Sequence, residues 1–274
     1  MKTGIFLSYK GLGANLLHLS YCREIAKKFG PITLITLNPK LKEVLTDDPN
    51  IKDIIYLNEF HKKFFDIFNL SSFLKNLNLD NLFIFYPSLR YFLSAKIAGI
   101  KKIYSYPLFV KKNLHLVKAA KKFTEKSLNI KDCPTETQII VNKKKIEKFK
   151  NDNKKNIILG IGSSGPTTKW GYKNYIELIK ELNKNNNFYF YLLCGPNEND
   201  DAEKIIQEIG ESYCRALSNK SISEVKNYIL LSDLYIGNDS FGHHISSQMG
   251  KPSFIILLDT PRAYSDYSIN QNRI

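Results

Sequence analysis

One stretch near the C-terminus carries the side chains best suited to holding an anion. Asp239 and Ser240 follow a strand-like run, and Gly242, His243 and His244 then open a short helical segment. A helix N-terminus presents unpaired N–H groups and a positive dipole end, to which a histidine adds a hydrogen bond or a charge. A single histidine is usually structural, but two in succession beside Asp-Ser at a strand end favour a binding site.

A second stretch, GIGSSGPTTKWG, also follows a strand-like run and precedes a helical pattern. Ser163 and Ser164 can place hydroxyl and backbone N–H groups around phosphate oxygens, with Lys169 nearby as a point charge. The stretch is not a P-loop, because it lacks Gly-Lys-Ser/Thr. Trp170, the only tryptophan, fits a packing role better than a ligand platform.

Two further stretches give weaker signals. In LLCGPNEND, Glu198 lies where a carboxylate can accept hydrogen bonds from ribose hydroxyls, although an acid that caps the next helix is the commoner role. In GLGANLLHLS, Gly11 and Gly13 follow the first strand-like run and permit a tight bend with close approach of a ligand. The alternative there is a plain tight turn.

An alternation of strand-like and helix-like segments positions these stretches. Apolar residues at helical spacing separate the strand-like runs, and the alternation restarts after a polar stretch at 142–155. This pattern predicts parallel sheets with crossover helices, which bind ligands beyond the carboxyl ends of their strands. We therefore expect two Rossmann-like α/β domains, residues 1–150 and 151–274. The strand-like runs of the first half are Gly4–Ser8, Ile32–Leu37, Asp53–Leu57, Leu82–Tyr86 and Ile103–Tyr106.

Composition and charge limit the classes of protein. No apolar run approaches the roughly 20 residues of a membrane span and no secretory signal is present, so we expect a cytoplasmic protein. The four cysteines lie far apart, which favours free thiols. Residues 1–150 hold 27 Lys and Arg against 12 Asp and Glu, whereas the rest hold 13 and 14. A basic half favours an anionic partner, unless its lysines are scattered solubilising charges.

A Phe-rich segment at 59–77 also carries Lys62 and Lys63. It has the composition of a basic amphipathic helix at a membrane surface. A helix buried on the first sheet explains the same phenylalanines with fewer assumptions, and we predict the buried helix.

In this order and spacing, the four stretches resemble the motifs of glycosyltransferase family 9, whose best-known members are the lipopolysaccharide heptosyltransferases. The family pattern is Gly-x-Gly-Asp, a Ser/Thr-rich loop leading to Lys/Arg-x-Trp-Pro, Gly-Pro-x-Glu, and Asp-Ser/Thr-Gly-x-x-His followed by Gly-x-Pro. The match is strong over the C-terminal half and thinner over the N-terminal half. The corresponding residues are Gly11–Ala14, Ser163–Gly171, Gly195–Glu198, Asp239–His244 and Gly250–Pro252.

The resemblance implies an α/β protein of the GT-B type, with two Rossmann-like domains whose parallel sheets face a central cleft. It implies inverting sugar transfer without a metal or other cofactor, and the sequence contains no Asp-x-Asp. The expected partners are an ADP-heptose-like nucleotide-diphosphate sugar and an anionic glycolipid acceptor of lipopolysaccharide core or a related surface glycan. The expected location is the cytoplasm, with peripheral contact at the inner face of the cytoplasmic membrane. We expect no nucleic-acid partner.

The resemblance also assigns residues. It places the ribose of the donor on Glu198 and the diphosphate-sugar on the serine loop and the histidine stretch. The predicted donor-binding residues are Gly13, Ser163, Ser164, Lys169, Glu198, Asp239, Ser240, Gly242 and His244.

The general base departs from the family pattern. The family's aspartate after the second glycine is Ala14 here, and alanine cannot take a proton. His18 follows four residues later, which is the same face of a helix one turn on. Its ordinary pKa of about 6.5 suits a base at neutral pH, so we predict His18 as the catalytic residue.

Three alternatives stay open. Another GT-B enzyme, such as a nucleotide-sugar epimerase, would act on a free nucleotide sugar and leave the one-sided basic charge unexplained. A catalytically silent nucleotide-sugar-binding protein is compatible with Ala14. A nucleic-acid binder agrees with the charge, but the sequence contains no recognised binding motif.

Overall fold

The computed structural model describes residues 1–58, 66–107, 115–136, 138–141, 154–163, 165–185, 187–259, 265 and 267–274. The chain divides into two compact units, Met1–Thr137 and Gln138–Ile274. The predicted domain boundary at 150–151 and most of the polar stretch at 142–155 lie outside the described residues, so that boundary stays a prediction.

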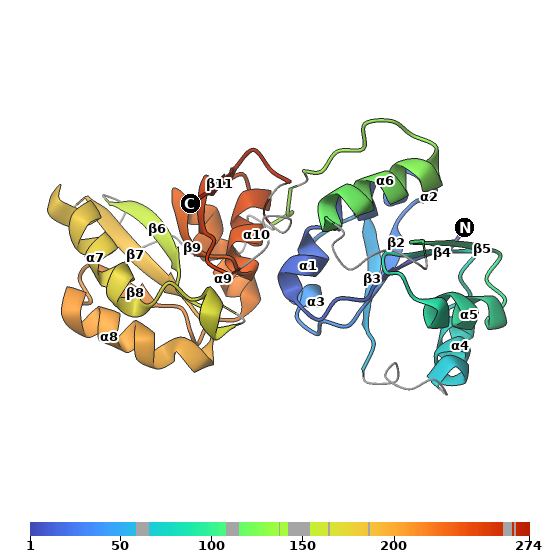
Figure 1. The fold of residues 1–274 in the computed structure, drawn as a ribbon, viewed down its shortest axis with the longest axis horizontal. Helices are drawn as coiled ribbons and strands as arrows, with labels where there is room; N and C mark the ends of the chain where they lie inside the picture. The colour runs from blue at the N-terminus through green and yellow to red at the C-terminus, as the bar shows by residue number, and fades with distance from the viewer. Residues whose placement is uncertain are drawn as a thin grey trace. The chain divides into compact units, whose positions relative to one another are not determined.

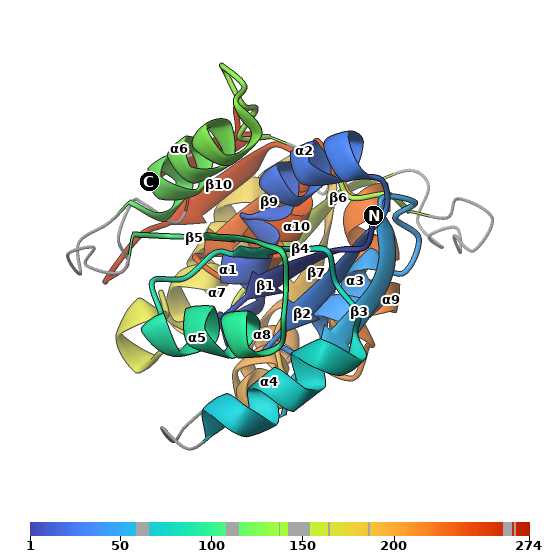
Figure 2. The same ribbon diagram turned by 90° about the vertical axis from the view of Figure 1, so that its right-hand side faces the viewer.

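The first unit is a five-stranded parallel sheet with the strand order β3-β2-β1-β4-β5. Helix α2 contacts α6, and α4 contacts α5; Figure 2 shows the two pairs on opposite faces of the sheet. The strands are β1 (Thr3–Leu7), β2 (Ile32–Thr36), β3 (Ile51–Tyr56), β4 (Asn81–Ile84) and β5 (Lys102–Ser105). The helices are α1 (Leu12–Leu16), α2 (Leu19–Phe29), α3 (Leu41–Leu45), α4 (Asp66–Asn76), α5 (Leu89–Ile97) and α6 (Leu116–Leu128).

Helix α4 is the described part of the Phe-rich segment. It buries Ile67, Leu70 and Leu74, and the last two belong to the core of the first unit. The prediction of a buried helix is confirmed for these residues. Phe68 is exposed, and residues 59–65 lie outside the described residues.

The second unit is a six-stranded parallel sheet with the order β11-β10-β9-β6-β7-β8. Helices α7 and α8 lie on one side of it, and α9 and α10 on the other (Figure 1). The strands are β6 (Lys155–Gly160), β7 (Phe188–Leu193), β8 (Cys214–Ala216), β9 (Leu234–Asn238), β10 (Ser253–Ile256) and β11 (Gln271–Arg273). The helices are α7 (Tyr172–Leu182), α8 (Asn199–Ile209), α9 (Ile222–Leu231) and α10 (Phe241–Gln248), with single 3₁₀ turns at Pro166–Thr168, Asn183–Asn185 and Pro196–Glu198.

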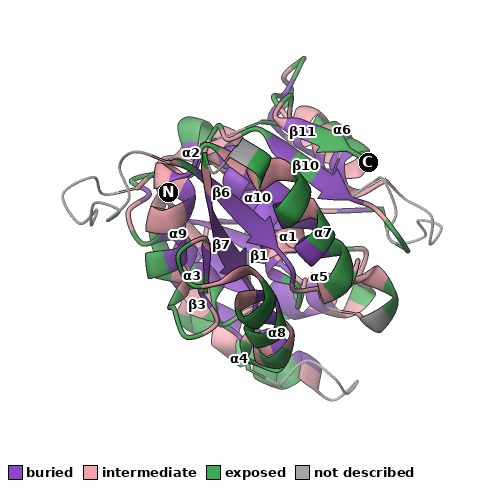
Figure 3. Ribbon diagram, turned by 90° about the vertical axis from the view of Figure 1, so that its left-hand side faces the viewer, coloured by how far each residue is buried: buried purple, intermediate pink, exposed green. Residues whose placement is uncertain are grey.

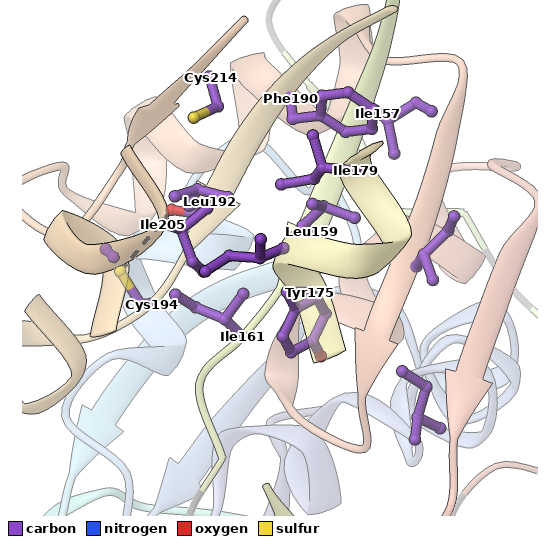
Figure 4. Packing of buried hydrophobic residues seen from close by; sticks show 14 residues of the cluster. Ile157, Leu159, Ile161, Tyr175, Ile179, Phe190, Leu192, Cys194, Ile205 and Cys214 are labelled. Carbon is purple, nitrogen blue, oxygen red and sulfur yellow. Dashed lines mark hydrogen bonds between the residues drawn. The ribbon is translucent and has the colours of Figure 1, made fainter. Parts of the chain in front are cut away.

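The core of the second unit lies between the sheet and the helices α7 and α8 (Figure 4). Alternate residues of β6 and β7, among them Leu159 and Leu192, point to this face because successive side chains of a strand point to opposite sides. Tyr175 and Ile179 of α7 and Ile205 of α8 cover them. Figure 3 shows β6 and β7 largely buried and α8 largely exposed on its outer side, so the loops at the sheet edge start from a packed core.

The two sheets share one topology. Numbered from the first strand of each unit, both follow the order 3-2-1-4-5, which is the Rossmann-like order, and the second adds a sixth strand. The predicted α/β class with two Rossmann-like parallel sheets is confirmed. In such sheets ligands bind beyond the carboxyl ends of the strands, where the strand order reverses. That point lies between β1 and β4 in the first unit and between β6 and β9 in the second.

Two predictions from composition are resolved by the structure. All four cysteines are free thiols, and all are buried. Among the described helices, none combines the length and the apolar character that a bilayer crossing requires.

Candidate functional site

Two glycines bring β6 and β9 together at the switch point of the second sheet. Gly160 and Gly237 face each other in the β6–β9 register. A Cβ on Gly237 would lie 2.5 Å from the Cα atom of Gly160, and a Cβ on Gly160 would overlap the hydroxyl of Tyr235. A side chain at Gly237 would therefore require the strands to shift, and one at Gly160 would require the buried Tyr235 ring to move. The loops that follow β6 and β9 start from this close pair.

Asn238, at the end of β9, ties the loop after β6 to the turn after β9. Its fully buried side chain donates from Nδ2 to the Ile161 carbonyl (2.8 Å) and accepts at Oδ1 from the Trp170 N–H (3.0 Å). Both ends of the serine loop are thus fixed to one amide. Inside the loop, the hydroxyl oxygens of Ser163 and Thr168 lie 2.5 Å apart in a hydrogen bond.

Two predictions concern this serine loop. Trp170 packs against the core of the second unit, with its ring edge-on to Tyr175 at 5.0 Å between centroids, so the packing role is confirmed. Ser164 lies outside the described residues.

A partly buried ion pair joins the same loop to the turn after β7. Lys169 Nζ lies 2.8 Å from Glu198 Oε1, and Glu198 Oε2 accepts a hydrogen bond from the Gly195 N–H at 3.0 Å. Glu198 is 8% exposed. Glu198 thus closes the 3₁₀ turn Pro196–Glu198, whose N-cap is Gly195, but it makes no side-chain capping hydrogen bond to α8, the helix that follows. The carboxylate still has lone pairs for a ligand, since each ionised oxygen can accept two hydrogen bonds.

The histidine stretch forms the start of α10. Ser240 is its N-cap, and the Ser240 N–H donates to His243 Nδ1 at 3.3 Å. The same nitrogen lies 3.1 Å from Asp239 Oδ1. A Cβ on Gly242 would lie 2.6 Å from Leu193 Cδ2, so the first turn of α10 rests directly on the end of β7. The turn is therefore built to a fixed position at the sheet edge.

Both histidines of α10 are buried and neutral. Burial lowers the pKa of His244 to about 3, and burial together with the neighbouring His244 lowers the pKa of His243 well below its ordinary value. His244 Nδ1 lies 2.7 Å from the Tyr267 hydroxyl, which also accepts from Gln248 Nε2 at 3.3 Å. In the tautomer that accepts at Nδ1, the His244 proton is on Nε2. Neither ring is charged at neutral pH. A histidine of this stretch can therefore offer a bound anion a hydrogen bond but no positive charge.

The same cluster has the donor types of a metal site. Asp239, His243 and His244 each offer a ligand atom, and these atoms lie within 4.8 Å of one another. Carboxylate and imidazole suit Zn²⁺. His243 Nδ1 already accepts from the Ser240 N–H, and His244 Nδ1 is bonded to the Tyr267 hydroxyl. The buried His243 Nε2, however, has no hydrogen-bond partner among the described residues. Transfer without a metal stays a prediction.

In the first unit, the Asn15 side chain stabilises the first turn and joins it to the end of β2. Asn15 Nδ2 donates to the carbonyls of Tyr9 (2.9 Å) and Gly11 (2.7 Å), and its Oδ1 accepts from the Thr36 hydroxyl (2.8 Å). Gly11 has φ −71°, and a Cβ there would meet nothing within 4 Å. No backbone strain demands this glycine, although the space beside it is open. Gly13 lies half-buried in α1, and its donor role stays a prediction.

His18 is enclosed between α1 and α2. Its side chain has no exposed surface, its Nδ1 donates to the Ala14 carbonyl at 2.6 Å, and its ring stacks on Tyr9 with Phe85 edge-on. Burial lowers its pKa to about 4, against the opposing effect of the Ala14 hydrogen bond. Its Nε2 has no hydrogen-bond partner among the described residues. The ring is a weak base with no open path to a substrate here, and its catalytic role stays a prediction.

The predicted residues thus separate into two groups. The described ones of the second unit lie at one edge of its sheet, whereas Gly13 and His18 belong to the first unit. Sequence reasoning missed Asn238 and Tyr235, whose hydroxyl donates to the Asn238 carbonyl at 3.1 Å. Their place in YIGNDS, at a strand end directly before the anion motif, was the available signal. No signal in the sequence indicated Tyr267, because it lies 23 residues beyond His244.

Comparisons with known proteins agree with this geometry. The chain matches the profile of glycosyltransferase family 9 (heptosyltransferase) over residues 87–263. A comparison with curated proteins gives no significant match. Among solved structures, the chain is similar to the ADP-heptose LPS heptosyltransferase II of E. coli, with TM-score 0.78, 15% identity and coverage of 100% of this chain and 90% of that chain.

Two further structures are similar to the whole chain. The E. coli heptosyltransferase WaaC with ADP-2-deoxy-2-fluoro heptose has TM-score 0.75 and 15% identity, with 100% of this chain and 93% of that chain covered. A family 9 glycosyl transferase from Veillonella parvula has TM-score 0.78 and 17% identity, with 100% and 85% covered.

At these identities the structures establish the fold, which is GT-B. The family match spans the three strand-end stretches of the second unit, whereas Gly11 and His18 precede it. Since that match covers more than half of the chain, the protein belongs to glycosyltransferase family 9 and is a glycosyltransferase.

Proposed function

We propose that the second unit binds a nucleotide-diphosphate sugar at the carboxyl edge of its sheet, and that the enzyme transfers this sugar to an anionic glycolipid. The convergence of three strand-end loops carries the proposal. Asn238 joins the loop after β6 to the turn after β9, and the Lys169–Glu198 pair joins it to the turn after β7. The edge lies at the topological switch point, where such sheets bind nucleotides.

The proposed donor is ADP-heptose or a close analogue. Two of the similar structures are named for ADP-heptose or for a fluorinated ADP-heptose analogue. Glu198 would accept hydrogen bonds from the ribose, because an ionised carboxylate only accepts. Asp239 would serve the hydroxyls of the transferred sugar for the same reason.

The diphosphate would lie at the start of α10. The N-terminal N–H groups of that helix, the Ser240 hydroxyl and the Nε2–H of a neutral His244 would be the donors to such an anion. Ser163 and Ser164 of the serine loop would add further donors. These groups are fixed before the reaction, so they can offset the charge of the departing diphosphate without a divalent ion. We propose transfer with inversion and without a metal on this basis.

The acceptor is proposed from charge. The excess of basic residues lies in residues 1–150, which suits an anionic glycolipid such as a phosphorylated lipopolysaccharide core. Such an acceptor would bring the enzyme to the inner face of the cytoplasmic membrane. The base that deprotonates the acceptor hydroxyl is not identified by the geometry; His18 remains the candidate from the sequence.

A second candidate is a catalytically silent nucleotide-sugar-binding protein, which Ala14 at the family's base position favours. A thermal-shift panel of nucleotide-diphosphate sugars followed by a transfer assay separates the two. A ligand at 100 times its Kd adds about 2.7 kcal/mol to the free energy of unfolding. We expect ADP-heptose to give the largest shift, and to be consumed with a glycolipid acceptor at a rate that EDTA leaves unchanged.

Stabilisation by ADP-heptose without transfer to any acceptor would support the silent binder. If no nucleotide-diphosphate sugar stabilises the chain, the proposed donor site is wrong. A transfer rate that EDTA abolishes and Zn²⁺ restores would assign the Asp239, His243 and His244 cluster to a metal.

A further inference from the structure

A cavity in the first unit lies away from the residues described so far. Its volume is about 730 Å³, within the roughly 300–1,000 Å³ of small-molecule sites. It is formed by β5, which is the edge strand of the sheet, and by one side of α6. Its apolar walls are Ile103, Tyr104, Tyr106, Pro107, Ala119 and Phe123.

The aromatic walls are held in place by the core. The Tyr104 ring stacks on Phe83 with 4.3 Å between centroids, and Phe123 lies edge-on to Phe85 at 4.9 Å and to Tyr106 at 5.0 Å. Each ring therefore has neighbours that fix its orientation. Tyr104 and Phe123 stay half-buried, because the cavity opens beside them.

The rim of the cavity is cationic. Lys122 and Lys126 line it from successive turns of α6, so they lie on the same face of the helix. Both are exposed, and neither forms an ion pair with a described residue, whereas Lys121 on the same helix lies 3.7 Å from Glu125. None of the lining residues in the described part of the chain is acidic. The cavity thus combines an apolar interior with two available positive charges.

These features favour an amphiphile over a polar ligand. The hydroxyls of the described lining belong to Tyr104, Ser105, Tyr106 and Ser127, and that of Tyr106 has no partner among the described residues. A sugar or a nucleotide base would lose more hydration inside than these few groups replace. An alkyl chain makes no hydrogen bonds to water and so gives up none on entering the cavity. A phosphate or carboxylate at its end would form ion pairs with Lys122 and Lys126. The cations would keep this anion at the water-exposed rim while the chain fills the interior.

We propose that this cavity binds an acyl chain of an anionic lipid, with the anionic group of that lipid on Lys122 and Lys126. The lipid is the membrane-embedded part of the glycolipid acceptor. The identity of the lipid as acceptor rests on the proposed function, whereas binding of the chain itself does not. The cavity would then hold the acceptor by a part that takes no role in the chemistry.

The first test is calorimetric titration of the full chain with dodecyl phosphate below its micelle concentration, without any nucleotide sugar. We expect saturable binding, with dodecyl maltoside and inorganic phosphate each at least about tenfold weaker. Ala119→Trp, which fills the interior, should abolish binding, and Lys122→Glu with Lys126→Glu should weaken it at least about tenfold. Lys118→Glu is the matched control, because Lys118 is exposed on α6 but does not line the cavity. Ser127→Trp replaces Ala119→Trp if that variant does not fold.

The second test connects the cavity to the acceptor. For the wild-type enzyme we expect KM to be at least about tenfold lower for an acylated acceptor than for its deacylated form, and this ratio should fall to near one in Ala119→Trp. No binding of dodecyl phosphate, or equal binding by Ala119→Trp and the wild type, overturns the proposal whether or not transfer occurs. An unchanged KM ratio in a variant that no longer binds dodecyl phosphate overturns the acceptor assignment. Absence of transfer by a wild-type chain that binds dodecyl phosphate contradicts the proposed function instead. Self-association that Ala119→Trp abolishes, without lipid binding, would assign the cavity to a second copy of the chain.

Discussion

The first turn of the first unit and the strand-end loops of the second unit occupy equivalent places in two sheets of the same topology. In the first unit, Asn15 and His18 direct their hydrogen bonds to their own turn and to Thr36. In the second unit, Asn238 and the Lys169–Glu198 pair connect loops that follow three different strands. Both units therefore have bonds between strand ends, and the second unit differs in that its bonds hold together the loops that carry the predicted anion-binding residues.

This difference bears on catalysis without a metal. Donors that stabilise a leaving group must be in position before the charge develops. Buried bonds between loops provide that fixed position, because breaking one leaves a polar group without a partner at a cost of about 1–3 kcal/mol. The first turn is also connected to the loop after β4, because the Tyr9 hydroxyl donates to the Phe85 carbonyl at 2.8 Å.

The largest expected effect comes from Gly237→Ala, which places a Cβ atom against the backbone of Gly160. We expect the second unit to lose about 4 kcal/mol of unfolding free energy, because neither strand can move without disrupting the sheet. Trp170, the only tryptophan, reports the second unit in a urea titration followed by fluorescence. Gly11→Ala is the matched control in the first unit, where the added carbon meets nothing within 4 Å, and should stay within about 0.5 kcal/mol of the wild type. Equal effects of the two substitutions would contradict the close β6–β9 pair.

Asn238→Ala removes the connection between the loop after β6 and the turn after β9. It should cause the next largest loss of unfolding free energy. It leaves the Ile161 carbonyl and the Trp170 N–H without their partner, which we expect to cost about 3 kcal/mol. Urea titration by Trp170 fluorescence measures this loss. Asn15→Ala removes a comparable set of bonds from the first unit, so it should lower the circular-dichroism midpoint and leave the Trp170 transition unchanged.

Acid should destabilise both units through their buried histidines. Burial lowers the pKa of His18 to about 4 and that of His244 to about 3, against about 6.5 in the unfolded chain. The unfolded chain therefore binds more protons, and the contribution of each histidine is complete above pH 6.5 and lost as the pH falls towards the folded pKa. From pH 6.5 to pH 5 each should cost about 2 kcal/mol.

Urea midpoints across that range, read by circular dichroism and by Trp170 fluorescence, check this loss in each unit. His18→Phe should remove the pH dependence from the first unit alone. If the urea midpoint of the first unit still depends on pH in that variant, another group titrates there.

Glu198→Gln keeps the shape of the side chain and removes the charge that pairs with Lys169. We expect the Kd for ADP to rise about tenfold, equivalent to about 1.4 kcal/mol, because the amide is a weaker acceptor for ribose hydroxyls. Glu208→Gln is the matched control, since Glu208 pairs with Lys180 on the surface of the same unit. A Kd that Glu198→Gln leaves unchanged would remove Glu198 from the ribose site.

The smallest expected effect is that of His18→Phe on transfer. Loss of a general base costs about 100-fold to 10,000-fold in rate. Because His18 is buried and its pKa is about 4, we expect a reduction of less than about tenfold in kcat. A reduction of 100-fold or more in a folded variant would instead establish His18 as the base.

The alternation of apolar runs was sufficient to predict both sheets and most helices, because burial on two faces gives parallel strands a continuous apolar pattern. It missed β8 and β11, which are short and read Cys-Arg-Ala and Gln-Asn-Arg. These strands form because they pair with neighbouring strands, and three residues are too few to show an alternation of apolar and polar side chains.

Only part of the candidate site could be predicted from the sequence, because some of its contacts join residues that are far apart in the chain. Asp239, Ser240 and His244 share a motif, and motifs are visible in a sequence. Asn238 acts through Ile161 and Trp170, which are 77 and 68 residues away, so its role appears only in the fold. His18 has the spacing of a base beside Ala14, but its burial depends on Tyr9 and Phe85.

Calorimetric titration of ADP-heptose into Asn238→Ala and Asn15→Ala, at a temperature where both are folded, tests the central claim most directly. If the donor lies on the connected loops of the second unit, Asn238→Ala should raise the Kd at least about tenfold and Asn15→Ala should change it less than about twofold. A Kd that responds to Asn15→Ala and not to Asn238→Ala would place the donor elsewhere and contradict the account.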